Sequence, residues 1–109
     1  MSAAERAAAA HLPYLKDLSE EQRGGFTEAV HGALLEILYA STSNLLLLPI
    51  QDLFGILDRV NVPNTVGPHN WAFRMPWTLV AMAEEPHVRG QLGRLRAFAD
   101  RYERAPFAP

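Results

Sequence analysis

Amide and aromatic side chains gather in the middle of the chain, in a segment rich in Asn, Pro and Gly. Asn61 and Asn70 carry amide groups that can hydrogen-bond either a ligand or their own backbone. Trp71 offers a flat apolar face beside these polar groups, an arrangement that suits a sugar ring. The alternative for Trp71 is that it packs the loop onto a core. These three residues form the candidate binding site, and a lone Asp52 further upstream is expected to cap a helix.

An apolar run of four leucines, residues 45–48, lies just ahead of this segment and ends at Pro49. A run with no polar alternation predicts a strand buried on both faces, as in parallel sheets. Loops that leave such strands often carry chemistry in α/β proteins. A lone strand leaves amides and carbonyls unpaired on both edges, so it must pair with another chain, a copy of itself or a larger fold.

The remaining pattern is helical. An alanine-rich stretch up to residue 10 predicts a short helix or a tail, and Ser19 with Gln22 has the spacing of a capping box. Gly24 and Gly25 then favour either a single turn that restarts near residue 26 or one strained helix. Helices are expected over 26–40, over 52–57, from a cap at Thr78 to Ala83, and over 86–102, with a loop over 58–70. The apolar stripe of the 26–40 helix consists of Phe26, Val30, Leu34, Ile37 and Leu38. The apolar stripe of the last helix consists of Val88, Leu92, Leu95, Phe98 and Tyr102. The predicted fold class is mainly α with one short apolar β-strand.

Composition narrows the function classes. The chain of 109 residues has a net charge of -2, which gives no global attraction to nucleic acid or anionic lipid. It has no cysteine, so disulfides and Cys-type zinc sites are excluded. Its four histidines show no metal-binding spacing, and acidic residues intersperse the arginines of the last helix. We expect a cytoplasmic protein with no metal, no cofactor, no nucleic-acid partner and no membrane span.

Five motifs occur in order: LLPIQDLFG at 47–55, DRVNVP at 58–63, TVG at 65–67, NW at 70–71 and RMPW at 74–77. Together they resemble the C-terminal part of 4-α-glucanotransferases of the amylomaltase or disproportionating-enzyme type. The resemblance runs from about residue 18 to residue 104, and residues 1–17 stay outside it as a tail or short helix. Asn64 is a departure, since the family usually has Gly or Ala there.

The resemblance implies the last βα portion of a (β/α)8 barrel, with residues 45–49 as its final strand and 61–71 as a loop at the rim. It implies retaining transfer on α-1,4-glucans by carboxylates that lie upstream of the similar region. We therefore expect no catalytic residue here, and a C-terminal fragment or stand-alone homologue that is inactive alone. On this reading Asn61, Asn70 and Trp71 contact the glucan.

Two alternatives remain open. The first alternative is a self-associating helical interaction protein derived from a barrel fragment. The second is a weak α-glucan-binding module. Both the leading interpretation and the first alternative predict a homo-oligomer or a partner chain that supplies the missing sheet edges.

Overall fold

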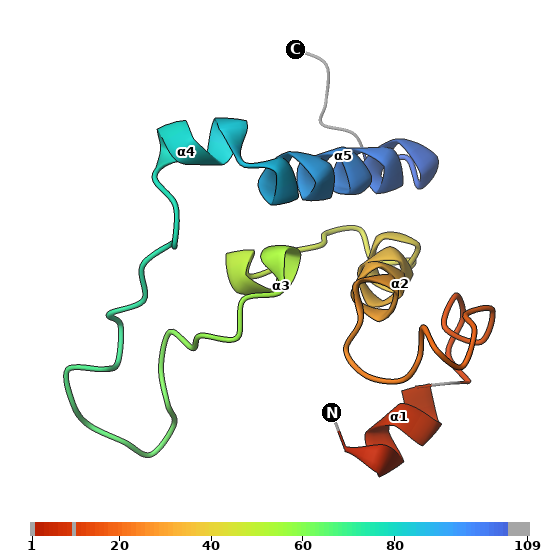
Figure 1. Cartoon of the computed structure of the whole chain (residues 1–109), viewed down its shortest axis with the longest axis horizontal. Helices are drawn as coiled ribbons and strands as arrows, with labels where there is room; N and C mark the ends of the chain where they lie inside the picture. Colours follow the sequence, from red (N-terminus) through yellow and green to blue (C-terminus); the bar gives the residue numbers. More distant parts are fainter. Residues whose placement is uncertain (1, 10, 105–109) are drawn as a thin grey trace. The chain divides into compact units, whose positions relative to one another are not determined.

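Helices make up all the regular structure in residues 2–9 and 11–104, the part of the chain that this computed structural model describes (Figure 1). The prediction of a mainly α chain is confirmed. The helices are α1 (Ala3–Ala9), α2 (Glu28–Tyr39), α3 (Ile50–Phe54), α4 (Leu79–Glu84) and α5 (Pro86–Arg101). The chain divides into two compact units, one built from residues up to Leu46 and from Ala97 onward, the other from Leu47–Arg96. Helix α5 therefore contributes to both.

The predicted strand is not formed. Residues 45–49 adopt no helix, strand or turn, and Leu45 and Leu47 are 71% and 80% exposed. A strand is defined by its ladder, and the described residues offer no second segment that pairs with this one. The prediction of a strand buried on both faces is therefore wrong for this segment.

Helix α2 begins at Glu28, two residues after the predicted start at residue 26. The Thr27 hydroxyl accepts a hydrogen bond from the Val30 N–H at 3.2 Å and caps the helix. Ahead of it, Ser19 and Gln22 form the expected capping box around a single turn, so the chain restarts here rather than continuing as one strained helix. An equivalent box between Ser2 and Glu5 starts α1, and its S-x-x-E spacing was readable but not predicted.

The first unit has its core between α2 and the turns ahead of it. Leu15, Val30 and Ala33 are buried together. The partly buried residues packed against them are Tyr14, Leu18, Leu34 and Ile37. Two members of the predicted stripe lie outside this core, since Phe26 is 52% exposed and Leu38 is 41% exposed. Phe26 instead lies 5.4 Å from the His31 ring.

A polar cluster joins α2 to the last turn of α5. The Glu36 carboxylate accepts hydrogen bonds from Arg101 Nη1 at 2.6 Å and from the Tyr102 hydroxyl at 2.7 Å. The Tyr14 hydroxyl lies 2.9 Å from that of Tyr102. Arg104 donates to the Tyr39 carbonyl at 2.7 Å and to two carbonyls beyond it, and so satisfies acceptors that the end of α2 leaves open.

The second unit has α3 against the N-terminal part of α5 (Figure 1). Helix α3 spans Ile50–Phe54, and Gly55 closes it as a left-handed C-cap with a φ of 67°. It therefore overlaps the predicted range 52–57 but begins two residues earlier and ends three residues earlier. Phe54 is buried and meets the Trp77 ring edge-on at 6.0 Å. Thr78 caps α4 through the Ala81 N–H, as expected.

The stripe predicted for α5 is partly wrong. Val88, Leu95 and Phe98 are buried, but Leu92 is 51% exposed. The buried position next to it is Gln91, at 5% exposure. A polar residue is tolerated there because its amide finds a carbonyl partner, which the hydrophobic pattern cannot reveal. None of the helices in the described residues is both long and apolar enough to cross a bilayer.

Stability at alkaline pH should depend on Tyr102. Its hydrogen bond with Tyr14, its removal from water and its hydrogen bond to Glu36 raise the pKa of Tyr102 to about 12, from an ordinary value of 10.0. Because the folded-state pKa is the higher one, the stabilisation is complete below pH 10 and is lost as pH rises toward 12. Urea denaturation of the unaltered chain and of Tyr102→Phe should therefore converge across that range. A constant difference in unfolding free energy would contradict the assignment.

Candidate functional site

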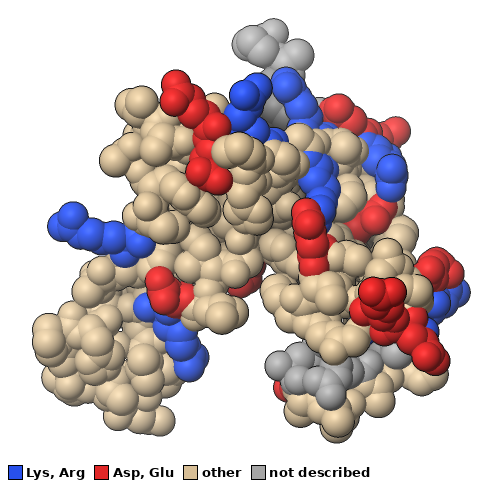
Figure 2. All heavy atoms as spheres, in the orientation of Figure 1, with Lys and Arg blue, Asp and Glu red and all other residues tan. Residues whose placement is uncertain are grey.

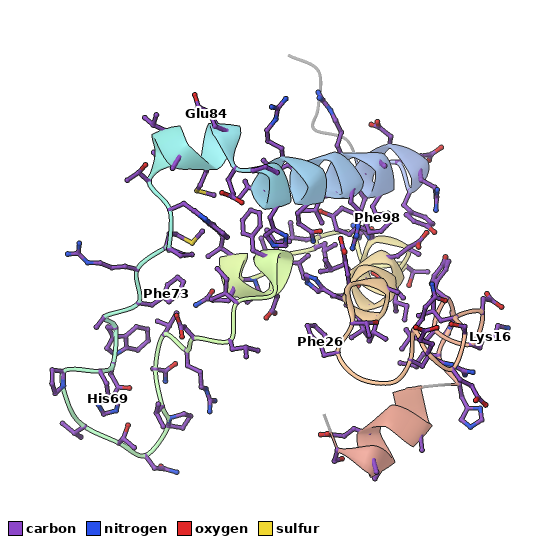
Figure 3. The ribbon with its side chains drawn as sticks, viewed as in Figure 1. Lys16, Phe26, His69, Phe73, Glu84 and Phe98 are labelled. Atoms are coloured by element: carbon purple, nitrogen blue, oxygen red, sulfur yellow. The ribbon has the colours of Figure 1, made fainter. Side chains whose placement is uncertain are left out.

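The loop that follows α3 is held by Asn70. Its Oδ1 accepts from the Val62 N–H at 2.7 Å, and its Nδ2 donates to the Thr65 carbonyl at 3.0 Å. Both ends of the amide are thus engaged within the loop, whose side chains can be followed in Figure 3 around the labelled His69. Asn70 thus satisfies nearby backbone, as loop asparagines often do, and its contact with a glucan stays a prediction.

Thr65 and His69 extend this bracing. The Thr65 hydroxyl donates its only proton to the Val62 carbonyl at 2.6 Å. His69 Nε2 lies 3.0 Å from the same hydroxyl oxygen. A Cβ added at Gly67 would lie 2.8 Å from His69 Nδ1, so glycine is needed at that position for the ring to pack where it does.

Trp71 sits at a strained backbone position. Its φ is 63°, a left-handed conformation that is costly for a bulky side chain, and its N–H donates to the Val60 carbonyl at 2.6 Å. The indole is 77% exposed. The loop's backbone bonds therefore maintain this geometry without the indole being packed into a core, and the ring face is available to a ligand.

Asn61 borders an open hollow of about 410 Å³. The flanking backbone groups, the Val60 carbonyl and the Val62 N–H, are taken by Trp71 and Asn70. The Asn61 backbone is thus held on both sides while its side chain makes no hydrogen bond to the described residues. The other residues that line the hollow are Pro49, Gln51, Asp52, Ile56, Leu57, Asp58, Arg59 and Val60.

The three predicted site residues do not converge on one cavity. Asn61 lines the hollow, whereas Asn70 and Trp71 are not among its lining residues. Asn70 and Trp71 instead hydrogen-bond the backbone on either side of Asn61, at Val62 and Val60. Gln51, Asp58 and Arg59 were not predicted. The sequence did offer a sign of Asp58 and Arg59, because these two charged residues stand close before Asn61 in the chain.

The hollow combines acceptors and donors beside aliphatic walls. Its lining residues include the amide-bearing Gln51 and Asn61, the acidic Asp52 and Asp58, and the basic Arg59. Asp52 lies in the first turn of α3, and Pro49, not Asp52, is the N-cap of that helix. Such mixed polar groups next to apolar surface match a ligand that carries many hydroxyls on a carbon ring, since each hydroxyl can both donate and accept.

Asn64 adopts a φ of 62°. This left-handed conformation explains why glycine suits the position, and Asn is among the residues that tolerate it best. The departure from the resembled motif therefore preserves the turn in the backbone.

Other ligand classes find less support. No group of three or more His, Asp or Glu side chains in the described residues could hold a metal ion. Arg101 and Arg104 at the end of α5 are engaged with Glu36 and with backbone carbonyls. Acidic and basic side chains are interspersed on the face drawn in Figure 2 and do not gather into a basic surface.

Comparison with known proteins identifies one family. The sequence model of the family described as 4-alpha-glucanotransferase matches residues 2–80, more than half of the 109 residues and all of the motifs between Leu47 and Trp77. No curated protein and no solved structure matches the chain.

Replacing Asn70 should loosen the loop. Asn70→Ala removes the acceptor for the Val62 N–H, and a lost hydrogen bond of about 1 kcal/mol corresponds to roughly five- to tenfold faster amide exchange at Val62. Asn61→Ala is the matched control, because it deletes the same amide group from a position that braces nothing. Hydrogen exchange followed by NMR measures both. Equal exchange at Val62 in the two variants would refute the bracing role.

Proposed function

Because this chain belongs to the 4-α-glucanotransferase family, we propose that it supplies part of the α-1,4-glucan-binding rim of such an enzyme and does not perform the transfer reaction alone. The observation that carries the proposal is the hollow beside Asn61. It lies within the matched residues, and its lining combines hydroxyl-binding groups with apolar walls.

The arrangement of the loop supports sugar binding. Asn61 is the amide that the loop leaves uncommitted, on a backbone held by Asn70 and Trp71. A pre-positioned amide loses little freedom when it binds, which favours even a weak ligand. The exposed Trp71 face adds a surface on which a pyranose ring stacks.

The chemistry of transfer argues for help from other residues. Retaining transfer needs a nucleophilic carboxylate and an acid/base carboxyl about 5 Å apart. The family resemblance puts those groups upstream of the motifs found here. In the proposal, Asp52 and Asp58 bind hydroxyls at the rim, and the reactive pair comes from another part of the enzyme.

Sugar binding can be measured with a single reporter. The variant Trp77→Phe leaves Trp71 as the remaining tryptophan, and titration with maltoheptaose should change its fluorescence. Adding Asn61→Ala should weaken the affinity about five- to tenfold, the effect of one lost hydrogen bond. Asn44→Ala, at an exposed asparagine that is not among the lining residues of the hollow, is the control and should leave the affinity unchanged.

Incubation with maltotriose tests the second half of the proposal. The purified chain should release no glucose and form no longer maltodextrins. Disproportionation by the chain alone would overturn the claim of inactivity. Absence of any fluorescence response at millimolar maltoheptaose would overturn the claim of glucan binding.

A second candidate is an interaction role through residues 45–50. Leu45, Leu47 and Ile50 are 71%, 80% and 40% exposed, and this apolar segment has no ladder partner in the described residues. Burying it against a second copy, or against a polypeptide that carries further barrel strands, would remove apolar surface from water and pair its backbone. This observation favours a homo-oligomer or a partner chain.

Light scattering at micromolar concentration tests this candidate. The unaltered chain should exceed the monomer mass of 12.1 kDa, and Leu47→Lys should return it to that mass. Leu79→Lys replaces a comparably exposed leucine, at 86%, outside the segment and should not change the mass. A monodisperse monomer for the unaltered chain would exclude self-association and leave only a foreign partner.

A further inference from the structure

Gln91 is the polar side chain that the described part of the chain buries most completely. It lies on α5 at 5% exposure, and its Nε2 donates to the Leu53 carbonyl at 2.6 Å. Leu53 is the next-to-last residue of α3, so its carbonyl lies too close to the helix end to find a donor within α3. The buried amide thus satisfies an acceptor that would otherwise be stranded away from water.

His87 stands one turn earlier on the same face of α5. Its Nε2 lies 3.5 Å from the Phe54 carbonyl, the next one along α3, and its ring lies 6.3 Å from that of Trp77. Residues four apart on a helix share a face, so α5 presents His87 and Gln91 to two consecutive carbonyls. The shorter contact, that of Gln91, is the stronger of the two.

The end of α3 determines where the residues that line the hollow are placed. The Gly55 and Ile56 N–H groups both donate to the Gln51 carbonyl, the latter at 2.8 Å, and Gly55 turns the chain with a φ of 67°. Gln51 and Asp52 on α3 form one side of the hollow, and residues 56–61 after the turn form the rest with Pro49. A shift of α3 would displace both sides.

We propose that Gln91 is a positioning residue for the hollow, which anchors the end of α3 and thereby sets the spacing between Gln51 and Asn61. As far as the ligand is concerned, this inference rests on the proposed function. Gln91 lies on α5, beyond the residues 2–80 that match the family, so a residue outside the matched segment sets the geometry of a site inside it.

Two variants separate positioning from general packing. Gln91→Leu keeps the approximate volume but cannot donate. Gln91→Glu cannot donate while its carboxyl is ionised, but it regains a donor when protonated, and burial moves that protonation toward neutral pH. Leu92→Ala, at the exposed neighbouring position of α5, is the control.

The readouts are amide exchange at Gly55 and Ile56, exchange at Leu34 in α2 as a reference for the first unit, and affinity for maltoheptaose. Gln91→Leu should speed exchange at Gly55 and Ile56 about tenfold, the effect of an unsatisfied buried carbonyl, and leave Leu34 unchanged. It should weaken maltoheptaose binding by a similar factor. Gln91→Glu should show the same defects at neutral pH and recover them as the pH is lowered.

Acid also protonates His87, so each variant is compared with the unaltered chain at the same pH. Unchanged exchange at Gly55 and Ile56 in Gln91→Leu would overturn the inference, and so would a Gln91→Glu defect that does not recover in acid. If the unaltered chain binds no maltoheptaose, the proposed function fails, and the amide readout still decides whether Gln91 positions the hollow. Normal affinity in both variants would also overturn it.

Discussion

Open carbonyl groups at the ends of short helices are the constraint on which this structure depends. A helix leaves its last carbonyls without partners inside the helix, and in a short helix these are a large share of its backbone. Here the partners come from the C-terminal quarter of the chain. Arg104 takes the Tyr39 carbonyl at the end of α2, and Gln91 takes the Leu53 carbonyl at the end of α3. Each unit is thus secured by a polar side chain from the same stretch of sequence.

The candidate site follows from this arrangement. The end of α3 is fixed by Gln91, Gly55 turns the chain, and the loop that follows is closed by Asn70 and by the backbone of Trp71. The polar groups therefore fall into two kinds, those that hold the loop and those that face the hollow. Asn61 belongs to the second kind and Asn70 to the first, although the two residues are chemically identical and were indistinguishable as sequence.

Local signals in the sequence were sufficient for most of the helices. Thr78 and the proline at the start of α5 act over one turn, so their effects were predicted. The Thr27 cap acts over the same distance but was not predicted. Gln91 could not be predicted, because its partner is 38 residues away and hydrophobic periodicity assigns buried positions to apolar residues. The prediction of a strand at 45–48 was wrong for a related reason, since a strand depends on a partner segment that no local pattern supplies.

Pro49 gives the exposed leucine run a further property. Unpaired apolar segments are sites where chains stack into cross-β aggregates, above all while a protein is being synthesised and folded. Proline has no N–H to offer, so a growing ladder along residues 45–48 stops at residue 49. Pro49, which ends the run and precedes α3, therefore also limits aggregation. Its replacement would lengthen the segment that can pair into a cross-β ladder.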